Sequence, residues 1–352
     1  MSHGARLTAH SAVSTALALH SDRALGELLD TAAPLGSGIG GKSALLEVAG
    51  TPVFVKRVPL TDPERRPSHV HSTANLFRLP PFCQYGIGRQ GIGSPGFGVW
   101  RELAVHTMTT NWALAGEYDG FPLMHHWRVL PDSTPLPEEL ADVERAVAHW
   151  GGSPHVRHRI EALQKSTASV ALFLEYIPQN LHHWLGEQTA AGAEAADRAC
   201  ALVERELAAG VSFMNSRGLL HFDTHFENIL TDGHRLYFAD YGLSLSSRFD
   251  LSPQETAFYD RHRTYDRCYS LSYLVNWLVT DLYGHGRDER EARIRAYARG
   301  ERPTGIPDTA AAIITRHAPL TAVMGDFFRR LRDGNRETPY PLDQLRRLGV
   351  AT

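Results

Sequence analysis

Two short motifs in the second half of the chain constrain its fold and its chemistry more than any other feature. The first runs from His221 through Asp223 to Asn228 (His-Phe-Asp-Thr-His-Phe-Glu-Asn), and the second is Asp240-Tyr-Gly. Short apolar runs that are typical of strands flank both motifs. The pattern therefore predicts two carboxylates and one amide on adjoining loops.

Side chains of these types suit the transfer of a phosphoryl group. That reaction requires a metal ion to neutralise phosphate charge and a carboxylate to orient the incoming hydroxyl. Asp240 would hold Mg²⁺, and Asn228 would be a second, neutral oxygen ligand. Asp223 would accept the hydrogen bond of the attacking hydroxyl and then its proton. The alternative is two surface turns, because Asp and Asn also favour turns.

The paired motifs resemble the catalytic loop and the metal loop of the protein-kinase-like superfamily. A His-x-Asp run with a second histidine, His225, is similar to bacterial aminoglycoside-phosphotransferase-like and other small-molecule phosphotransferases. The resemblance extends, with gaps, from about Leu35 to Trp277. It implies an α+β, two-lobed fold with a small antiparallel-sheet N-lobe and a helical C-lobe. It also implies ATP and Mg²⁺ as cofactors.

A glycine-rich segment followed by a lysine strand occurs where this resemblance requires one. Gly36, Gly38 and Gly41 have the spacing G-x-G-x-x-G, which lets a backbone approach phosphates closely. A turn at Ala49-Gly-Thr-Pro joins two apolar runs into a predicted hairpin, and Lys56 ends the run Val-Phe-Val-Lys. Only three of the 36 basic residues are lysines. The resemblance implies that Lys56 contacts the α- and β-phosphates, and the scarcity of lysine argues against a chance placement here.

A P-loop is the second interpretation of the same glycines. Residues 36–43 also match G-x-x-x-x-G-K-[ST], a motif that requires a buried strand before it and a helix after it. The preceding residues 29–34 make a poor strand, and a proline turn with a valine-rich run follows Lys42. The context favours the kinase-type hairpin. A further G-x-G-x-x-G at Gly86, Gly88 and Gly91 has no lysine strand after it, and we interpret it as a loop.

The resemblance implies a carboxylate partner for Lys56 on the helix expected over residues 100–116. Glu102 is the first candidate, and Glu117, at the end of that helix, is the alternative. Further on, residues 172–178 resemble the hinge between lobes. Backbone groups of Glu175 and Ile177 would there bind adenine.

Three further residues near the motifs receive structural interpretations. Asp266 would begin a buried helix and hydrogen-bond to the catalytic-loop backbone, as the resemblance implies. His221 would orient that loop, and the role of His225 stays open. The pairs His125-His126 and His182-His183 have no third ligand placed by the sequence, so we do not expect zinc sites.

The expected organisation is a strand-rich first part and a helix-rich second part. The first part holds two unusual inserts, one irregular and the other with a helix over residues 137–150. The predicted domains are a helical extension (1–30), an N-lobe (31–176) with inserts at 57–98 and 132–167, and a helical C-lobe (177–352).

The chain departs from regulated protein kinases after the metal motif. Asp266 follows Asp240 by only 26 positions, and no Ala-Pro-Glu follows. This departure puts conventional kinase regulation in doubt. One acceptor would be a small metabolite or antibiotic. The other, which we favour, is a Ser or Thr of a peptide, as with lanthipeptide-type (RiPP) kinases that act before elimination by a separate lyase. A pseudokinase that binds nucleotide as a scaffold is a third interpretation.

Composition limits the partners and the compartment. The 36 basic and 39 acidic residues give a net charge of −3, so we expect neither nucleic acid nor a membrane as a partner. No apolar run approaches the ~20 residues of a membrane span, and the start of the chain lacks the pattern of a signal peptide. Three scattered cysteines indicate a reducing cytoplasm. Arginine outnumbers lysine, which suggests a GC-rich bacterial source.

Overall fold

The chain divides into two units in the computed structural model, which describes residues 3–38, 41–86, 92–133 and 135–350. The first unit comprises the residues up to Tyr176 together with Asp240–Glu255, and the second comprises Ile177–Ala239 and the residues from Thr256 onward. The first unit contains a small antiparallel sheet, and the second is mainly helical. The predicted α+β class is therefore confirmed.

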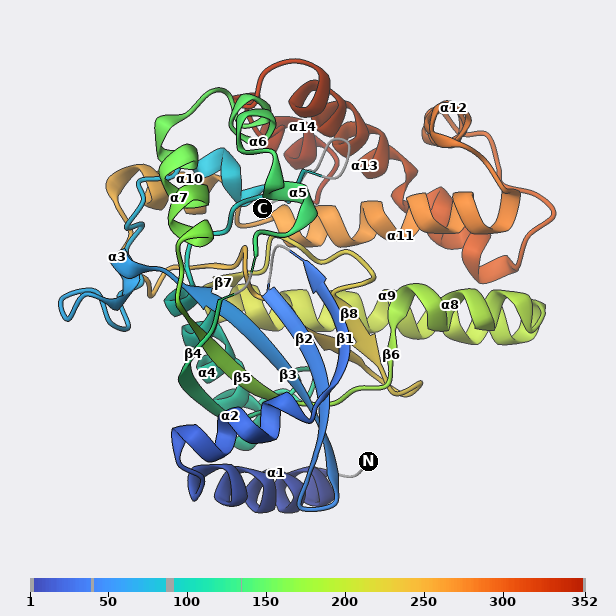
Figure 1. The fold of residues 1–352 in the computed structure, drawn as a ribbon. Coiled ribbons are helices and arrows are strands. Elements are labelled where there is room, and N and C mark those ends of the chain that lie inside the picture. Colours follow the sequence, from blue (N-terminus) through green and yellow to red (C-terminus); the bar gives the residue numbers. More distant parts are fainter. Residues whose placement is uncertain (1–2, 39–40, 87–91, 134, 351–352) are drawn as a thin grey trace. The chain divides into compact units, whose positions relative to one another are not determined.

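A five-stranded sheet forms the centre of the first unit (Figure 1). All neighbouring strands are antiparallel, and the hairpin expected around Ala49 joins two of them. In spatial order the strands are β1 (Ala33–Gly38), β2 (Gly41–Val48), β3 (Thr51–Leu60), β5 (Ala168–Glu175) and β4 (Met124–Pro131).

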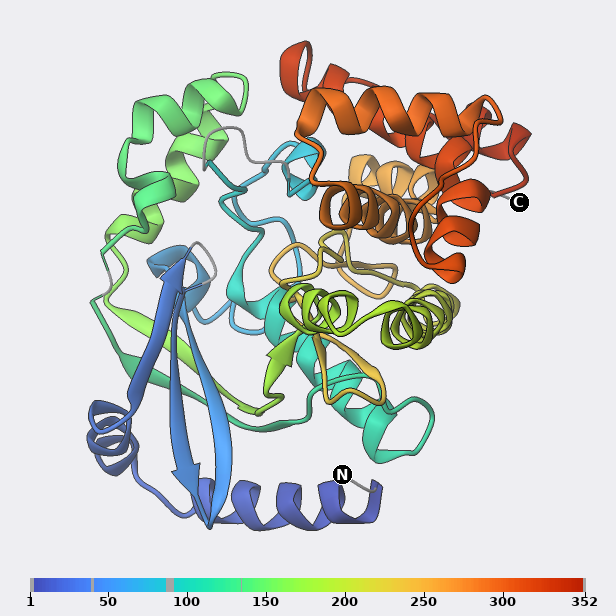
Figure 2. The same cartoon turned by 90° about the vertical axis from the view of Figure 1, so that its right-hand side faces the viewer.

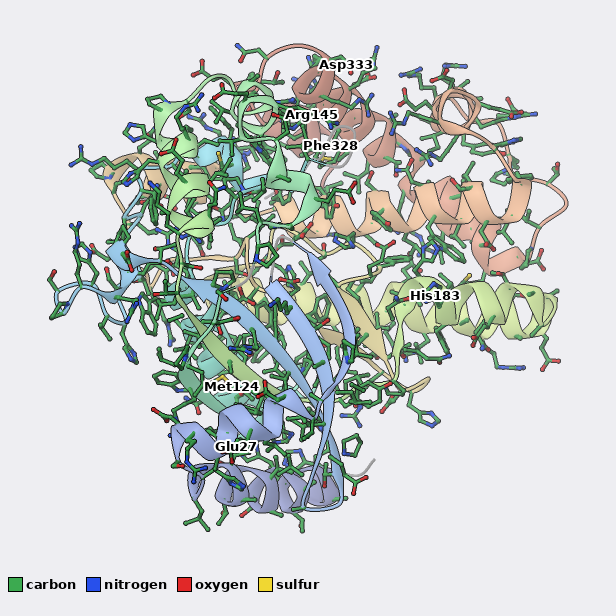
Figure 3. All side chains as sticks on the ribbon, viewed as in Figure 1. Glu27, Met124, Arg145, His183, Phe328 and Asp333 are labelled. Carbon is green, nitrogen blue, oxygen red and sulfur yellow. The ribbon has the colours of Figure 1, made fainter. Side chains whose placement is uncertain are left out.

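Helices cover both faces of this sheet (Figure 2). On one face, α1 (His3–Ala18) and α2 (Asp22–Asp30) bury Val13, Leu17 and Leu25 against apolar residues of β2, β3, β4 and β5. On the other face, α4 (Val99–Leu114) packs Trp100 and Leu103 against β3, β4 and β5. Side chains alternate between the faces of a strand. Each strand side chain therefore points either toward α1 and α2 or toward α4. Met124 of β4 belongs to the layer of α4, and Figure 3 marks its position.

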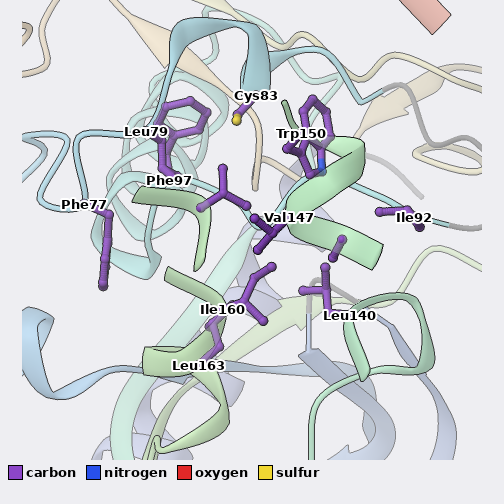
Figure 4. Packing of buried hydrophobic residues seen from close by; sticks show 12 residues of the cluster. Phe77, Leu79, Cys83, Ile92, Phe97, Leu140, Val147, Trp150, Ile160 and Leu163 are labelled. Atoms are coloured by element: carbon purple, nitrogen blue, oxygen red, sulfur yellow. The ribbon is translucent and has the colours of Figure 1, made fainter. Parts of the chain in front are cut away.

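The two inserts of the first unit pack together around a core of their own (Figure 4). The first insert supplies Phe77, Leu79 and Phe97, and the second supplies Trp150 and Ile160. Burial of these large side chains stabilises both segments, because each apolar group removed from water contributes favourably. Their elements are α3 (Asp62–Arg65), the 3₁₀ helix η1 (Pro81–Gln84), α5 (Glu138–Ala141), α6 (Val143–His149) and α7 (Pro154–Gln164).

The second unit is built around the buried helix α11 (Tyr265–Tyr283), which packs against α9, α12 and α13. A three-stranded antiparallel sheet, β6–β8–β9, carries the loop from Asp223 to Asn228. The other elements are α8 (Leu181–Ala190), α9 (Ala193–Ser216), α12 (Arg287–Ala298), α13 (Asp308–Asp333), α14 (Leu342–Arg347), β6 (Gln179–Asn180), β8 (Ile229–Thr231) and β9 (Leu236–Phe238). The short β7 (Leu219–Leu220), β10 (Leu245–Ser246) and α10 (Pro253–Arg261) complete the chain.

Several sequence expectations were wrong in detail. The helical extension expected over residues 1–30 consists of two helices, because Ser21 caps a new one: its Oγ accepts a hydrogen bond from the backbone of Ala24 at 3.2 Å. The helix expected over residues 137–150 is α5 followed by α6, and α7 was not foreseen. The first insert begins after Leu60, since β3 extends that far.

The segment Asp240–Glu255 was expected in the second domain but belongs to the first unit. Hydrogen bonds and ion pairs to residues of the first unit, described below, account for this placement. The three cysteines, Cys83, Cys200 and Cys268, are buried free thiols. Across the described part of the chain, no helix combines the length and the apolar character that crossing a membrane requires.

Candidate functional site

The alternation of β3 directs Lys56 toward α4. Val53 and Val55 face α1 and α2, whereas Val58 and Leu60 face α4. Lys56 is two residues before Val58 and shares its face. Its Nζ lies 2.7 Å from Oε1 of Glu102, and both side chains are buried. Of the two acidic partners considered from the sequence, the structure pairs Glu102 with Lys56; Glu117 follows the end of α4.

A second carboxylate of the first unit also contacts Lys56. Oδ1 of Asp240 lies 2.9 Å from Nζ of Lys56 and accepts a hydrogen bond from the backbone N–H of Gly242 at 3.3 Å. Asp240 has a left-handed backbone with φ of 61°, and its side chain is 41% exposed. Burial alone would lower the pKa of Lys56, but the charges of Asp240 and Glu102 more than offset this and raise it. Lys56 is therefore a stable ammonium between two carboxylates.

The aromatic residue of the Asp240-Tyr-Gly motif fixes the position of this segment. Tyr241 is fully buried, and its ring lies 4.8 Å from that of His106 on α4 in an edge-to-face arrangement. Burial raises the pKa of Tyr241 and keeps its hydroxyl protonated. The same helix thus positions both Glu102 and the residue next to Asp240.

Polar contacts within the first unit hold the rest of the segment up to Glu255. Arg101, beside Glu102 on α4, donates to Oε1 of Glu255 at 2.7 Å, and both side chains are buried. The backbone of Asp250 donates to Thr73 Oγ1 at 2.9 Å, and Gln84 Nε2 donates to the carbonyl of Leu243. Sequence reasoning missed these contacts, because no local pattern links residues 73–101 to residues 243–255.

Glu64 is a further residue that sequence reasoning missed. Its buried carboxylate accepts hydrogen bonds from the backbone of Val99 (2.9 Å) and Thr61 (3.0 Å) and pairs with Arg159 (3.0 Å). The contact to Val99 satisfies an N–H at the start of α4 and fixes where the helix carrying Glu102 begins. The run from Thr61 to Glu64 matches a capping box, and that signal could have identified it.

In the second unit, Asp223 and Asn228 are in direct contact. Nδ2 of Asn228 donates to Oδ2 of Asp223 at 3.0 Å and to its backbone carbonyl at 3.1 Å. This arrangement fixes the amide orientation, so Oδ1 of Asn228 points away from Asp223. The backbone N–H of Ala239 donates to the carbonyl of Asn228 at 3.0 Å. The chain then passes from the second unit to the first at the bond between Ala239 and Asp240.

Asp266 supports the loop as the sequence predicted. Its two carboxylate oxygens accept hydrogen bonds from the backbone of His221 (2.6 Å) and Phe222 (2.8 Å). Phe222 has a left-handed φ of 66°, a conformation that costs energy for a bulky residue. Burial raises the pKa of Asp266 to about 6. His221 donates from Nε2 to the carbonyl of Ala239 at 3.0 Å, so it orients the loop.

His225 lies between two carboxylates. Its Nδ1 is 2.8 Å from Oε2 of Glu227, and its Nε2 is 3.6 Å from Oδ2 of Asp223. Burial alone would lower the pKa of His225, but its contacts with Asp223 and Glu227 raise it to about 10. The side chain is therefore an imidazolium at neutral pH that holds Asp223 in place.

This protonation has a measurable consequence for stability. A pKa raised from 6.5 to about 10 means that the folded state binds the His225 proton more tightly than the unfolded state. The stabilisation is complete below pH 6.5 and is lost as pH rises toward 10. We expect the free energy of unfolding, measured by urea denaturation, to fall more steeply over this window in the wild type than in His225→Gln. Equal slopes would contradict the assignment.

The two residues predicted for the hinge, Glu175 and Ile177, belong to different units. Glu175, at the end of β5, forms a bidentate ion pair with the buried Arg6 of α1, at 2.8 and 2.6 Å. Its backbone N–H donates to the carbonyl of Leu123 at 2.7 Å. Ile177 is the first residue of the second unit, and its side chain is buried. The role of Arg6 was not foreseen, because it precedes its partner by 169 residues.

The glycine-rich segment forms the hairpin of β1 and β2, in which Gly38 pairs with Gly41. Gly41 has φ of 111°, and a Cβ atom there would lie 2.0 Å from the carbonyl oxygen of Arg57. Gly36 has open space beside it, with Ser43 Oγ at 3.9 Å. The hairpin itself thus requires a glycine at position 41, whereas position 36 has room for a side chain.

The P-loop interpretation was wrong. Lys42 lies on β2, where a P-loop requires a helix, and its side chain is 42% exposed. Its Nζ is 3.8 Å from Oδ1 of Asp132. Of the second glycine motif, Gly88 and Gly91 lie outside the described residues.

The histidine pairs make contacts with other rings. His125 Nδ1 is 3.1 Å from Nδ1 of His10, and His182 Nδ1 accepts from Trp277 Nε1 at 3.1 Å. Within residues 3–38, 41–86, 92–133 and 135–350, no three His, Cys, Asp or Glu side chains are arranged to hold a metal ion.

Compared with models of known protein families, the chain matches none, and it matches no curated protein. The functional interpretation therefore depends on the residues and the geometry described above.

Proposed function

We propose that the chain has a protein-kinase-like fold and transfers the γ-phosphate of ATP to an alcohol. The observation that supports this most is the set Lys56, Glu102 and Asp240 in the first unit. One ammonium and two carboxylates carry a net negative charge. Of these three side chains, Asp240 alone is substantially exposed. Such a set can receive a divalent cation and a polyphosphate together.

The donor types fit Mg²⁺. Asp240 offers carboxylate oxygen on an exposed side chain, and the orientation of Asn228 leaves its amide oxygen directed away from Asp223. Hard cations prefer such oxygen ligands. Bound magnesium would neutralise the charge of the phosphates. Lys56 would bind the α- and β-phosphates, held in place by Glu102.

The residues of the second unit supply the acid–base part of the reaction. The acceptor hydroxyl would donate a hydrogen bond to Asp223, whose orientation is set by Asn228 Nδ2. As the hydroxyl oxygen forms a bond to the γ-phosphorus, the bond from that phosphorus to the β-phosphate oxygen breaks. The hydroxyl proton passes to Asp223, and ADP leaves.

We favour Ser or Thr of a peptide as the acceptor, such as a RiPP precursor that a separate lyase then processes. A small hydroxylated molecule is the alternative acceptor. A pseudokinase scaffold is the competing function. Retention of Lys56, Asp223, Asn228 and Asp240 together favours catalysis, because a scaffold requires none of them.

Binding of Mg·ATP tests this proposal. A ligand that binds only the folded state, at a hundredfold excess over Kd, raises the free energy of unfolding by about 2.7 kcal/mol. We expect such an increase for the wild type, measured by denaturant unfolding with and without Mg·ATP, and its loss in Asp240→Ala. The matched control is Asp343→Ala, because that side chain is 85% exposed. The proposal would be contradicted if Mg·ATP did not raise the free energy of unfolding of the wild type, or if it raised that of Asp240→Ala equally.

A further inference from the structure

A pocket of about 420 Å³ lies in the second unit among α8, α11, α12 and α13. Its volume falls in the range of small-molecule sites. Tyr273 and Trp277 of α11 and Phe328 of α13 line it, and Figure 3 marks Phe328. Asn276 and Thr280 of α11 add polar groups to the lining.

Positive charge exceeds negative charge in this pocket. Arg287, Arg290 and Arg332 line it, with Glu291 as the acidic residue. Two of these charges are already matched: Glu291 pairs with Arg295 at 3.3 Å, and Arg332 pairs with Asp333 at 3.1 Å. Among the described residues, Arg287 and Arg290 have no carboxylate within ion-pair distance. Two guanidinium groups thus remain for a ligand.

A hydrogen bond to α11 holds Arg290 at the wall of the pocket. One terminal nitrogen donates to Oγ1 of Thr280 at 3.0 Å. Its Nε is buried and lacks a hydrogen-bond acceptor within the part of the chain that the structure describes. Burial and then the charge of Arg287 lower the pKa of Arg290. A buried donor without an acceptor is costly, and the negative charge of a ligand in the pocket would partly offset that cost.

Tyr273 connects the pocket to the catalytic loop. Its ring lies 4.9 Å from that of Phe226, and its hydroxyl donates to Oε2 of Glu227 at 3.5 Å. Phe226 is three residues after Asp223, the proposed base. Tyr273 therefore lies between the pocket and the side chains that follow Asp223.

We infer that this pocket binds a carboxylate of the acceptor through Arg287 and Arg290, while the hydroxyl of the same molecule extends past Tyr273 to Asp223. This inference rests on the proposed function and adds the chemical class of the substrate. Guanidinium groups bind carboxylates through paired hydrogen bonds, and the aromatic walls accommodate the carbon chain that bears the acid. An acidic residue near Ser or Thr in a peptide and a small hydroxy acid share this chemistry.

Calorimetric titration of the full chain without nucleotide tests the inference. The probes are acetyl-Glu-Glu-Ser-Glu-Glu-amide, the same peptide with Lys in place of Glu, and gluconate. We expect the wild type to bind at least one acidic probe and to reject the lysine peptide. The double variant Arg287→Gln/Arg290→Gln should weaken that binding by about tenfold or more. Binding of only one acidic probe identifies the source of the carboxylate.

The control is Arg293→Gln, which removes one charge from the same helix outside the pocket and should change affinity by less than about twofold. Arg287→Gln alone, at an exposed position, gives the test if the double variant fails to fold. Failure of both acidic probes, equal binding of the lysine peptide, or unchanged affinity in the Arg287 variants would overturn the inference. Because nucleotide is absent, these results are independent of whether Mg·ATP binds.

Discussion

Replacing Asp223 with asparagine is expected to slow phosphoryl transfer by about 10²–10⁴-fold while leaving Mg·ATP binding unchanged. The amide cannot take the proton of the acceptor hydroxyl, yet it keeps the size of the carboxylate. Its neighbour Asn228 can still donate to the remaining oxygen, as it does to Oδ2 at 3.0 Å. Transfer is measured with labelled ATP, and nucleotide binding by calorimetry on the same preparations.

The control for this variant is Asp260→Asn, which makes the same change on a side chain that is 54% exposed. It should retain full transfer. If Asp223→Asn transferred phosphate at the wild-type rate, Asp223 would not be the base. If Asp223→Asn lost both nucleotide binding and transfer, the variant would instead disturb the site as a whole.

Replacing Lys56 with methionine is expected to lower stability and to abolish transfer. Glu102 is 3% exposed, so removal of its partner leaves a buried carboxylate without a cation. Breaking such a pair costs about 3–5 kcal/mol in the free energy of unfolding. The lost ammonium would also remove the proposed contact with the phosphates. Urea denaturation and the transfer assay measure the two effects separately.

A second substitution separates these two effects. Glu102→Gln in the Lys56→Met background removes the buried charge, so much of the lost stability should return while transfer stays absent. Lys42→Met is the matched control, because that lysine is 42% exposed and should change stability by less than about 0.5 kcal/mol. Recovery of transfer in the double variant, or greater harm from Lys42→Met, would contradict the role of Lys56.

Strong local patterns predicted the elements that hold the candidate residues. The turn at Ala49-Gly-Thr-Pro gave the β2–β3 hairpin, and strand alternation then places Lys56 on one face. Helical spacing after Trp100 predicted α4 and placed Glu102 on its first turn. These features depend on residues that are close together in the sequence, and for that reason they could be predicted.

Contacts between distant segments could not be predicted in the same way. The inserts share one core through pairs such as Phe77 and Ile160, and neither insert shows this pattern alone. Arg6 and Glu175 pair across 169 residues, and Arg101 and Glu255 across 154. Their burial depends on the completed fold, because charged residues are buried only where a partner is present. The sequence therefore placed Asp240–Glu255 in the wrong unit.

Formation of ADP from Mg·ATP by the wild-type chain is the most direct test of the central claim. The reaction would contain serine peptides and small hydroxy acids as acceptors, and mass spectrometry would identify any phosphorylated product. The account predicts ADP together with one phosphorylated acceptor, both reduced at least about 100-fold in Asp223→Asn. Tight binding of Mg·ATP, with equally slow ADP formation in both proteins and an unmodified acceptor, would contradict the account and indicate a nucleotide-binding scaffold.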